Sequence, residues 1–329
     1  MQWNTLADWA ADPNSQSQSH SVGKVIEGFP RVPAEYLSYN YRKEKQLEQI
    51  HKYKPDILCL QEVDHFSDFL EPTLEQAGYK GIFNRKLRTS DGVACFYRTE
   101  AFELVTSISL HLVSQLPASN TEQAIEAAAF VASSVASNVN NGTRNQPAII
   151  AELRMRETKD STDLGVRLSD KRLIVATTHF KAKHEFELLR AAQVRQLLAA
   201  ISDFNKDKLP VILAGDLNSG PYGHVVADIK EAGYTSAYKF DGVMDVDIHD
   251  RVINTIYSSE LTTYKYRKSK TGGPDEKITN RIDYIFYQGQ GLTWNSNRAL
   301  PSIVDIGENG LPNADIPSDH LPLVSTFVM

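Results

Sequence analysis

The sequence has few of the features that mark membrane, fibrous or disulfide-stabilised proteins. No stretch approaches the roughly 20 apolar residues that a membrane helix needs, and neither a glycine repeat nor a sustained heptad repeat is present. The only cysteines among the 329 residues are Cys59 and Cys95, too few for a disulfide framework. Both stand in apolar runs, so we interpret them as small buried side chains in a protein of a reducing compartment.

The chain also lacks an excess of positive charge. Lys and Arg total 35 against 41 Asp and Glu, which gives a net charge of −6. This balance argues against a protein that coats nucleic acid through bulk charge, although it leaves room for a local basic pocket. The hydrophobic content of 41% is typical of a folded soluble protein and too high for a disordered chain.

Short apolar runs alternate with helical stretches along the chain. Runs of β-branched and aromatic residues edged by polar residues predict strands at 57–60, 92–97, 147–153, 173–177, 211–214, 282–287 and 321–328. We expect helices at 42–53, 66–76, 185–204 and 222–231, and in the helix at 185–204 apolar residues recur along one face at three- and four-residue steps. The alternation indicates a layered α/β protein, and we expect loops at 11–21 and 118–145, which are rich in small polar residues.

Carboxylates, amides and histidines follow or enter several of the predicted strands. One such residue alone is as easily a cap, a turn or a hydrogen-bonded core group. Asp283, however, stands between apolar neighbours, where a buried carboxylate is costly unless it is paired. Strand ends that meet at one edge would gather the whole set into a single site: Glu62, His179, Asp216, Asn218, Asp283, Asp319 and His320.

These side-chain types favour metal-assisted hydrolysis. Hard oxygen ligands suit Mg²⁺, or alternatively Mn²⁺, and no cysteine cluster or His-x₃-His pair suggests zinc. Without an obvious nucleophilic Ser or Cys, the set points to attack by water on phosphorus. A metal ion would polarise a phosphoryl oxygen while a carboxylate or histidine positions and deprotonates the water.

Taken together and in this order, the motifs resemble the exonuclease–endonuclease–phosphatase superfamily over nearly the whole chain. They are Trp3-Asn4, Leu60-Gln61-Glu62, Thr178-His179, Gly215-Asp216-Leu217-Asn218, Ile282-Asp283-Tyr284-Ile285 and Ser318-Asp319-His320. The resemblance implies a single catalytic domain over residues 1–329, folded as a four-layer α/β sandwich of two packed sheets flanked by helices. Because the chain opens on what looks like the end of a strand, we expect the natural protein to begin further upstream.

The resemblance also implies a role for each residue of the site. Glu62 would be the principal Mg²⁺ ligand, with Asn4 beside it and Asp319 near the metal. Asp216 would orient or deprotonate the attacking water. The reacting phosphate would be contacted by Asn218, His179, Asn145 and His320, the last of these held by Asp283.

Two basic motifs narrow the resemblance to the nocturnin group in the deadenylase-like branch of the superfamily. They are Thr178-His179-Phe180-Lys181-Ala182-Lys183 and Thr262-Thr263-Tyr264-Lys265-Tyr266-Arg267. Resemblance to this group implies a phosphatase that removes the 2′-phosphate from NADP⁺ and NADPH. A dinucleotide with several phosphate charges needs a compact cationic clamp, which this resemblance assigns to Lys181, Lys183, Lys265 and Arg267, with Gly92 at the pocket wall.

A more ordinary interpretation of these basic residues is a solvated surface strand and helix start. Lys183 stands where the group is expected to have Arg, so the charge is kept but the planar fork that binds phosphate through two hydrogen bonds is lost. We interpret the nearby Arg85-Lys86 pair as exposed surface charge.

Two other functions are compatible with the same motifs. A poly(A)-specific 3′-exoribonuclease would use the same metal site but needs room and stacking surfaces for successive nucleotides. An inactive scaffold should have lost at least one acid, and none is missing. We expect a monomer without a membrane span that acts on NADP(H), with RNA as a partner only for the exoribonuclease. The expected compartment is the cytoplasm, or the mitochondrion if a targeting segment lies upstream.

Overall fold

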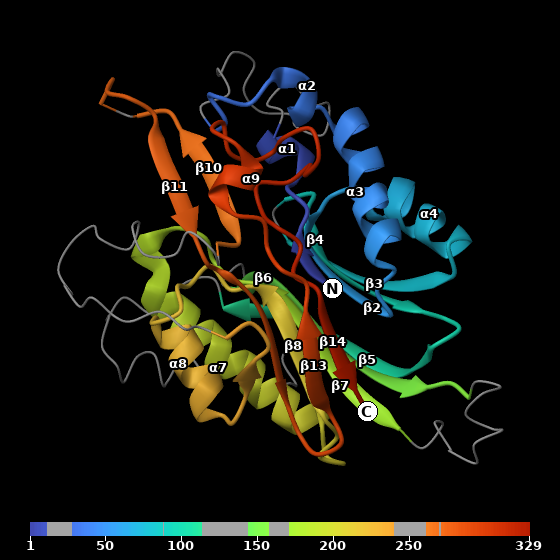
Figure 1. The fold of residues 1–329 in the computed structure, drawn as a ribbon. Helices are drawn as coiled ribbons and strands as arrows, with labels where there is room; N and C mark the ends of the chain where they lie inside the picture. Colours follow the sequence, from blue (N-terminus) through green and yellow to red (C-terminus); the bar gives the residue numbers. More distant parts are fainter. Residues whose placement is uncertain (12–27, 88, 114–143, 158–170, 240–260, 270) are drawn as a thin grey trace.

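Two β-sheets pack face to face, and helices cover their outer faces (Figure 1). This computed structural model describes residues 1–11, 28–87, 89–113, 144–157, 171–239, 261–269 and 271–329. The arrangement confirms the predicted four-layer α/β sandwich. Of the two predicted loops, the described residues include only 11, which ends a helix, and 144–145, which begin a strand.

The first sheet has four strands in the order β1-β2-β4-β3, with β1 and β2 parallel and the other pairs antiparallel. The strands are β1 (Gln2–Asn4), β2 (Ile57–Val63), β3 (Tyr79–Arg85) and β4 (Gly92–Arg98). Three helical segments cover the outer face: α3 (Tyr39–Tyr53), the π-helical η1 (Phe66–Leu70) and α4 (Glu71–Gln76). Trp3, Leu58 and Ile50 are among the buried side chains that join this sheet to its helices.

The second sheet has the strand order β5-β6-β7-β8-β12-β9. Its strands are β5 (Phe102–Val113), β6 (Arg144–Met155), β7 (Arg172–His179), β8 (Val211–Asp216), β9 (Thr235–Ser236) and β12 (Asp283–Gln288). The parallel pair β7 and β8 needs a long crossover, which contains the 3₁₀ turn η2 (His184–Phe186) and helix α7 (Glu187–Phe204). Helix α8 (His224–Glu231) packs beside α7 on the same face (Figure 1).

The inner faces of the two sheets form the central core. Cys59 and Cys95 face each other across β2 and β4 and pack with Val175, Ala214 and Ile285 of the second sheet. Both cysteines are free and buried, as predicted. Burying this apolar surface supplies the main driving force that holds the sheets together.

Helices α1 (Asp8–Ala11), α2 (Ala34–Leu37) and α9 (Ile303–Ile306) lie with the hairpin of β10 (Thr263–Arg267) and β11 (Glu276–Asn280) at one end of the sandwich (Figure 1). Strands β13 (Thr293–Asn297) and β14 (Ser325–Val328) form a separate antiparallel pair. The strand predicted at 321–328 is shorter, because residues 321–324 lie outside β14; there Leu323 forms only an isolated bridge with Gln2.

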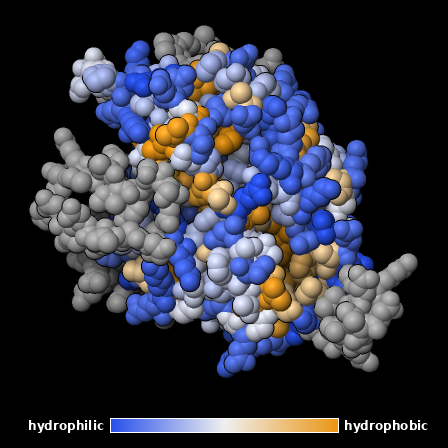
Figure 2. All heavy atoms as spheres, viewed as in Figure 1, coloured by the Kyte–Doolittle hydropathy of each residue, from blue (hydrophilic) through white to orange (hydrophobic). Residues whose placement is uncertain are grey.

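Among the residues that the structure describes, no helix combines the length and the apolar character needed to cross a bilayer. Hydrophilic residues dominate the face drawn in Figure 2, and apolar residues show there in separate small areas.

Candidate active site

The register of the second sheet brings three of the predicted site residues side by side. His179, the last residue of β7, pairs with Asp216, the last residue of β8, and Asp216 pairs in turn with Asp283, the first residue of β12. In the first sheet Asn4 pairs with Gln61, next to Glu62. The predicted convergence of strand ends is therefore present in the fold.

Close contact between β7 and β8 sets this register. A Cβ atom at Gly215 would lie 2.3 Å from the carbonyl oxygen of its β7 partner Thr178, far inside normal contact. Only glycine lets the two backbones approach this closely without a shift of the strands. The position of Asp216 relative to His179 thus depends on residue 215 being a glycine, which has no side chain.

We predict that Gly215→Ala lowers the free energy of unfolding by about 3 kcal/mol, because the strands must separate to admit the methyl group. Gly220→Ala is the matched control, since a Cβ atom there meets nothing within 4 Å. Urea denaturation of the two variants measures the difference. Equal stability of the two would contradict the close strand contact.

Glu62 lies at an irregularity in β2. The register between β2 and β4 shifts between Gln61 and Val63, and Glu62 has φ of +55°. Such a bulge interrupts the strict alternation of side chains and re-aims the residue that it contains. Glu62 Oε1 accepts a hydrogen bond from Asn4 Nδ2 at 3.0 Å, and Oε2 accepts one from the backbone N–H of Ala7 at 3.0 Å.

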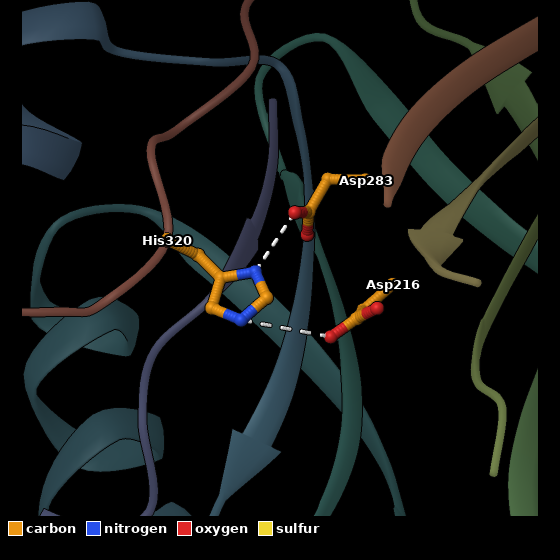
Figure 3. Close-up of side chains that lie close together, drawn as sticks. All are labelled: Asp216, Asp283 and His320. Atoms are coloured by element: carbon orange, nitrogen blue, oxygen red, sulfur yellow. Dashed lines mark hydrogen bonds and ion pairs between the residues drawn. The ribbon is translucent and has the colours of Figure 1, made fainter. Parts of the chain in front are cut away.

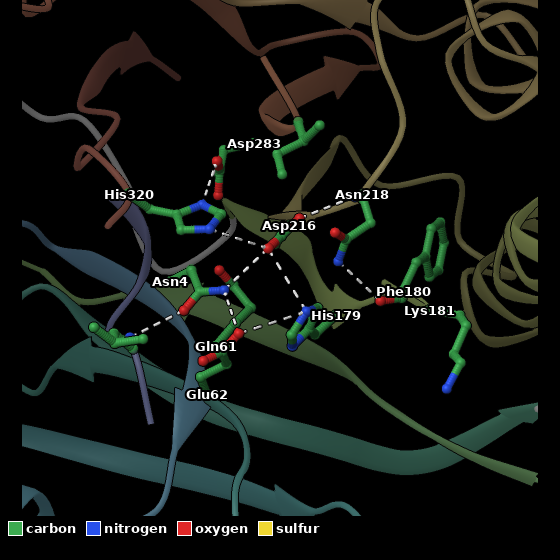
Figure 4. Close-up of polar contacts among 12 residues, drawn as sticks. Asn4, Gln61, Glu62, His179, Phe180, Lys181, Asp216, Asn218, Asp283 and His320 are labelled. Carbon is green, nitrogen blue, oxygen red and sulfur yellow. Dashed lines mark hydrogen bonds and ion pairs between the residues drawn. The ribbon is translucent and has the colours of Figure 1, made fainter. Parts of the chain in front are cut away.

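Asn4 links Glu62 to Asp216 at the centre of the cluster. Its Nδ2 also donates to Asp216 Oδ2 at 3.0 Å, while Asp216 Oδ1 accepts the backbone N–H of Asn218 at 2.9 Å. His179 Nε2 lies 3.6 Å from Asp216 Oδ2 and 4.0 Å from Glu62 Oε1. In Figure 4 these side chains point toward one another from four different segments.

His320 stands between two carboxylates (Figure 3). Its Nδ1 lies 2.8 Å from Asp283 Oδ2, and its Nε2 lies 3.9 Å from Asp216 Oδ2. Burial opposes a charge on the imidazole, but the negative charges of Asp283, Asp319 and Asp216 raise the pKa of His320 to about 10. Two carboxylates paired directly across strands would repel each other, and an imidazolium between them offsets that repulsion.

The carboxylates of this cluster differ in acidity. Burial and the neighbouring charge of Asp283 raise the pKa of Asp216 above its ordinary value. Burial alone would also raise the pKa of Asp319, but its ion pair with Lys265 and the charge on His320 lower it to about 2. Burial likewise disfavours the charge on Glu62, yet His179 and the hydrogen bonds from Asn4 and Ala7 leave its pKa below the usual value.

The donor set fits a hard divalent cation. Four carboxylates, those of Glu62, Asp216, Asp283 and Asp319, face the charged His320 and Lys265, so negative charge remains to be neutralised. Ligand atoms of Asp216, Asp283 and His320 lie within 4.8 Å of one another and could hold a metal ion. Glu62 offers a second possible position for a metal ion, because its carboxylate is partly exposed to solvent while those of Asp216 and Asp283 are buried.

Positive charge gathers at the loop that follows His179. Lys181 is half-buried, and burial together with the charges of Lys86 and Lys183 lowers its pKa. Lys86 lies in the turn between β3 and β4 and was interpreted from the sequence as exposed surface charge. That interpretation is wrong, because Lys86 is half-buried and close enough to shift the titration of Lys181.

A model of the Endonuclease/Exonuclease/phosphatase family matches residues 1–320. The chain belongs to this family. Human nocturnin is 30% identical over 342 residues, which cover 99% of this chain and 64% of nocturnin. The CCR4-Not complex 3′-5′-exoribonuclease subunit Ccr4 of Kluyveromyces lactis is 26% identical over 343 residues, covering 90% of this chain and 38% of that protein.

A solved structure agrees with the sequence matches. The human nocturnin catalytic domain with bound sulfate anion superposes with a TM-score of 0.61 and 27% identity, covering 99% of this chain and 91% of that chain. The chain spans less than two thirds of the full length of human nocturnin. The sequence and structural matches thus agree on membership of the Endonuclease/Exonuclease/phosphatase family, with nocturnin and Ccr4 among the relatives.

Four residues predicted from the family resemblance lie at or beyond the edge of the cluster. Asn145 Oδ1 accepts the backbone N–H of Leu87 at 2.7 Å, so this amide fixes the turn that carries Lys86. Lys183 and Arg267 are exposed. A Cβ atom at Gly92 would lie 2.3 Å from the carbonyl oxygen of Asn84, so strand pairing alone already requires glycine there.

The structure also reveals site residues that the sequence did not suggest. The buried Gln2 donates through Nε2 to Asp283 Oδ1 at 3.1 Å and to Gln61 Oε1 at 2.8 Å. The side-chain amides of Gln2 and Gln61 thus help to orient the Asp283 carboxylate that pairs with His320. Thr262 Oγ1 accepts the backbone N–H of Asp283 at 3.2 Å. Gln2 directly precedes Trp3-Asn4, and Thr262 opens the Lys265–Arg267 motif, so proximity to a motif was the only available signal.

Proposed function

We propose that the chain is a Mg²⁺-dependent phosphatase that removes the 2′-phosphate from NADP⁺ and NADPH. The reaction consumes one water and yields inorganic phosphate with NAD⁺ or NADH. The observation that carries the proposal is the grouping of Lys86, Lys181 and Lys183 at the loop that follows His179, whose side chain lies against Glu62 and Asp216. A compact group of lysines matches the dense charge of a phosphorylated dinucleotide, and the similarity to human nocturnin supports it.

Glu62, with Asn4 beside it and Asp319 nearby, would hold the Mg²⁺ ion. When bound, the ion polarises a phosphoryl oxygen and offsets the negative charge of the cluster. Asn4 fixes the Glu62 and Asp216 carboxylates relative to each other through its bonds to both. Mn²⁺ has the same ligand preferences and is expected to substitute.

Asp216 would position the attacking water and accept its proton. Burial and Asp283 raise the pKa of Asp216, which makes it a stronger base than an exposed aspartate. The charged His320, oriented by Asp283, would donate from Nε2 to a phosphoryl oxygen, and His179 and Asn218 would contact the others. Asn218 is held for this role by its Nδ2 bond to the Phe180 carbonyl at 3.1 Å.

A poly(A)-specific 3′-exoribonuclease is the second candidate, favoured by the 26% identity to the Ccr4 exoribonuclease subunit. Both reactions use water and the same cluster. To separate them, purified protein should be given NADPH, NADP⁺, adenosine 2′-phosphate and oligo(A), each with Mg²⁺ and with a chelator. Phosphate release from NADPH without shortening of oligo(A) supports the phosphatase, and the reverse result refutes it.

Within this proposal, Lys181→Ala should raise the KM for NADPH by about 10- to 100-fold, as expected for the loss of a charge-assisted phosphate contact. The kcat for p-nitrophenyl phosphate, which lacks the dinucleotide, should change little. Lys206→Ala is the control, because Lys206 is exposed and pairs with Asp203 at the far end of α7. An unchanged KM for NADPH would remove Lys181 from the clamp.

A further inference from the structure

Successive backbone N–H and carbonyl groups of the loop after His179 are hydrogen-bonded to other parts of the protein. Phe180 N–H donates to the Asp216 carbonyl at 3.0 Å, and the Phe180 carbonyl accepts Asn218 Nδ2. Lys181 N–H donates to Gln193 Oε1 at 3.1 Å. The carbonyls of Lys181 and Lys183 both accept from Nη1 of Arg190, at 2.8 and 2.6 Å.

Arg190 is buried on α7, with only 3% of its surface exposed. The side of its guanidinium away from the loop donates to Glu187 Oε2, from Nε at 3.1 Å and from Nη2 at 2.7 Å. Planar guanidinium groups suit such a two-bond contact. Arg190 is therefore fixed by Glu187 on one side while it holds two loop carbonyls on the other.

Glu187 extends the connection to the loop that follows Asp216. Its Oε1 accepts Ser219 Oγ at 3.0 Å and the backbone N–H of His224 at 3.0 Å. Gly223 makes room for this carboxylate, since a Cβ atom there would lie 2.6 Å from Glu187 Oε1 and 2.3 Å from Ser219 Oγ. One ion pair, between the buried Arg190 and the half-buried Glu187, thus joins the lysine loop to the segment carrying Asp216 and Asn218.

Lys183 needs such support more than its neighbours. Its φ of +80° is a left-handed conformation that costs an L-residue energy unless the surroundings hold it. The Lys183 carbonyl accepts the shortest of the Arg190 hydrogen bonds. Without Arg190, the segment 181–183 would lose two carbonyl bonds and relax away from this conformation.

We propose that Arg190 is a positioning residue that sets where Lys181 and Lys183 present their ammonium groups, and so sets the affinity for the phosphorylated substrate. The inference deepens the proposed function and rests on it for the substrate. The hydrogen-bond partners of Arg190 are Glu187 and the carbonyls of Lys181 and Lys183, outside the carboxylate cluster. Removal of Arg190 should therefore alter KM and leave kcat nearly unchanged.

The test compares Arg190→Met and Arg190→Lys with the control Arg195→Met. Arg195 lies on α7, as Arg190 does, but pairs with Asp228 of α8. Arg190→Met should raise the KM for NADPH about tenfold with kcat within about twofold, as for a weakened charge-assisted contact. Arg190→Lys should recover part of the loss, and Arg195→Met should leave KM unchanged.

A double-mutant cycle identifies the route of the effect. On a Lys181→Ala/Lys183→Ala background, Arg190→Met should add almost nothing to KM. The same tenfold increase on that background would overturn the proposal, because Arg190 would then act through other residues. If Arg190→Met does not fold, the milder Arg190→Lys is put through the same cycle with the same criterion.

Amide hydrogen exchange separates this inference from the proposed function, because it needs no substrate. Arg190→Met should speed exchange of the Lys181 and neighbouring loop amides in the free protein, relative to Arg195→Met. If the wild type fails to hydrolyse NADPH and NADP⁺, the proposed function fails, and faster loop exchange still supports the positioning role. Unchanged loop exchange would refute it.

Discussion

Glu62→Gln should reduce kcat/KM at saturating Mg²⁺ by about 10³-fold, since several kcal/mol of charge stabilisation at the phosphorus would be lost. Both carboxylate oxygens accept N–H donors, Oε1 from Asn4 and Oε2 from Ala7. In either orientation of a glutamine, its NH₂ group therefore faces another hydrogen-bond donor, from Asn4 or from Ala7. The variant loses the ligand charge and also the orientation of the side chain.

The Mg²⁺ dependence of the rate is the diagnostic measurement for this variant. The Mg²⁺ concentration for half-maximal activity should rise strongly, whereas Glu75→Gln, on the exposed side of α4, should leave it unchanged. If Glu62→Gln kept the wild-type Mg²⁺ dependence, Glu62 would not be a metal ligand. The cluster of Asp216, Asp283 and His320 would then become the alternative metal position.

Asp216→Asn should lower kcat by about 10³-fold, the middle of the range for removing a general base. The substitution removes the group that we propose accepts the proton of the attacking water. Both oxygens of Asp216 accept N–H donors, from Asn218 and Asn4, so asparagine also faces a donor in either orientation. The KM should change less than kcat, because the lysine loop is untouched.

Thermal stability and kcat, measured together, separate loss of the base from loss of the fold. Asp216→Asn removes one of two paired buried carboxylates, which relieves repulsion with Asp283 and limits any fall in Tm. Asp203→Asn, at an exposed position of α7, is the control for both measurements. A variant that folds and turns over at the wild-type rate would exclude Asp216 as the base.

The polar strand ends could be predicted from sequence because each adjoins a run of apolar residues that must be buried. His179, Asp216 and Asp283 then meet because adjacent strands place their ends together. Glu62 is different, since no sequence pattern reveals the bulge and the positive φ that aim it at Asn4. Strands β3 and β5 were also missed, because their mixed exposure does not give the continuous apolar runs used to find strands.

Long-range support of the site was beyond the reach of the sequence. An arginine in a helix is normally a surface residue, and only the tertiary fold buries Arg190 of α7 against the carbonyls of Lys181 and Lys183. The Lys265–Asp319 pair likewise joins residues assigned to phosphate and to metal. Partner choice across more than 50 positions depends on packing that local patterns do not encode.

The two ends of the described chain meet inside the site. Ser318 Oγ donates to the Asn4 carbonyl at 2.6 Å, and Trp3 Nε1 donates to the His320 carbonyl at 2.8 Å. Ribosomes synthesise Asn4 before Ser318, so the hydrogen bond between them forms only after more than 300 further residues have been added. A nascent chain therefore holds Glu62 and Asp216 without His320, so the hydrolysis proposed above should begin only once synthesis has passed His320.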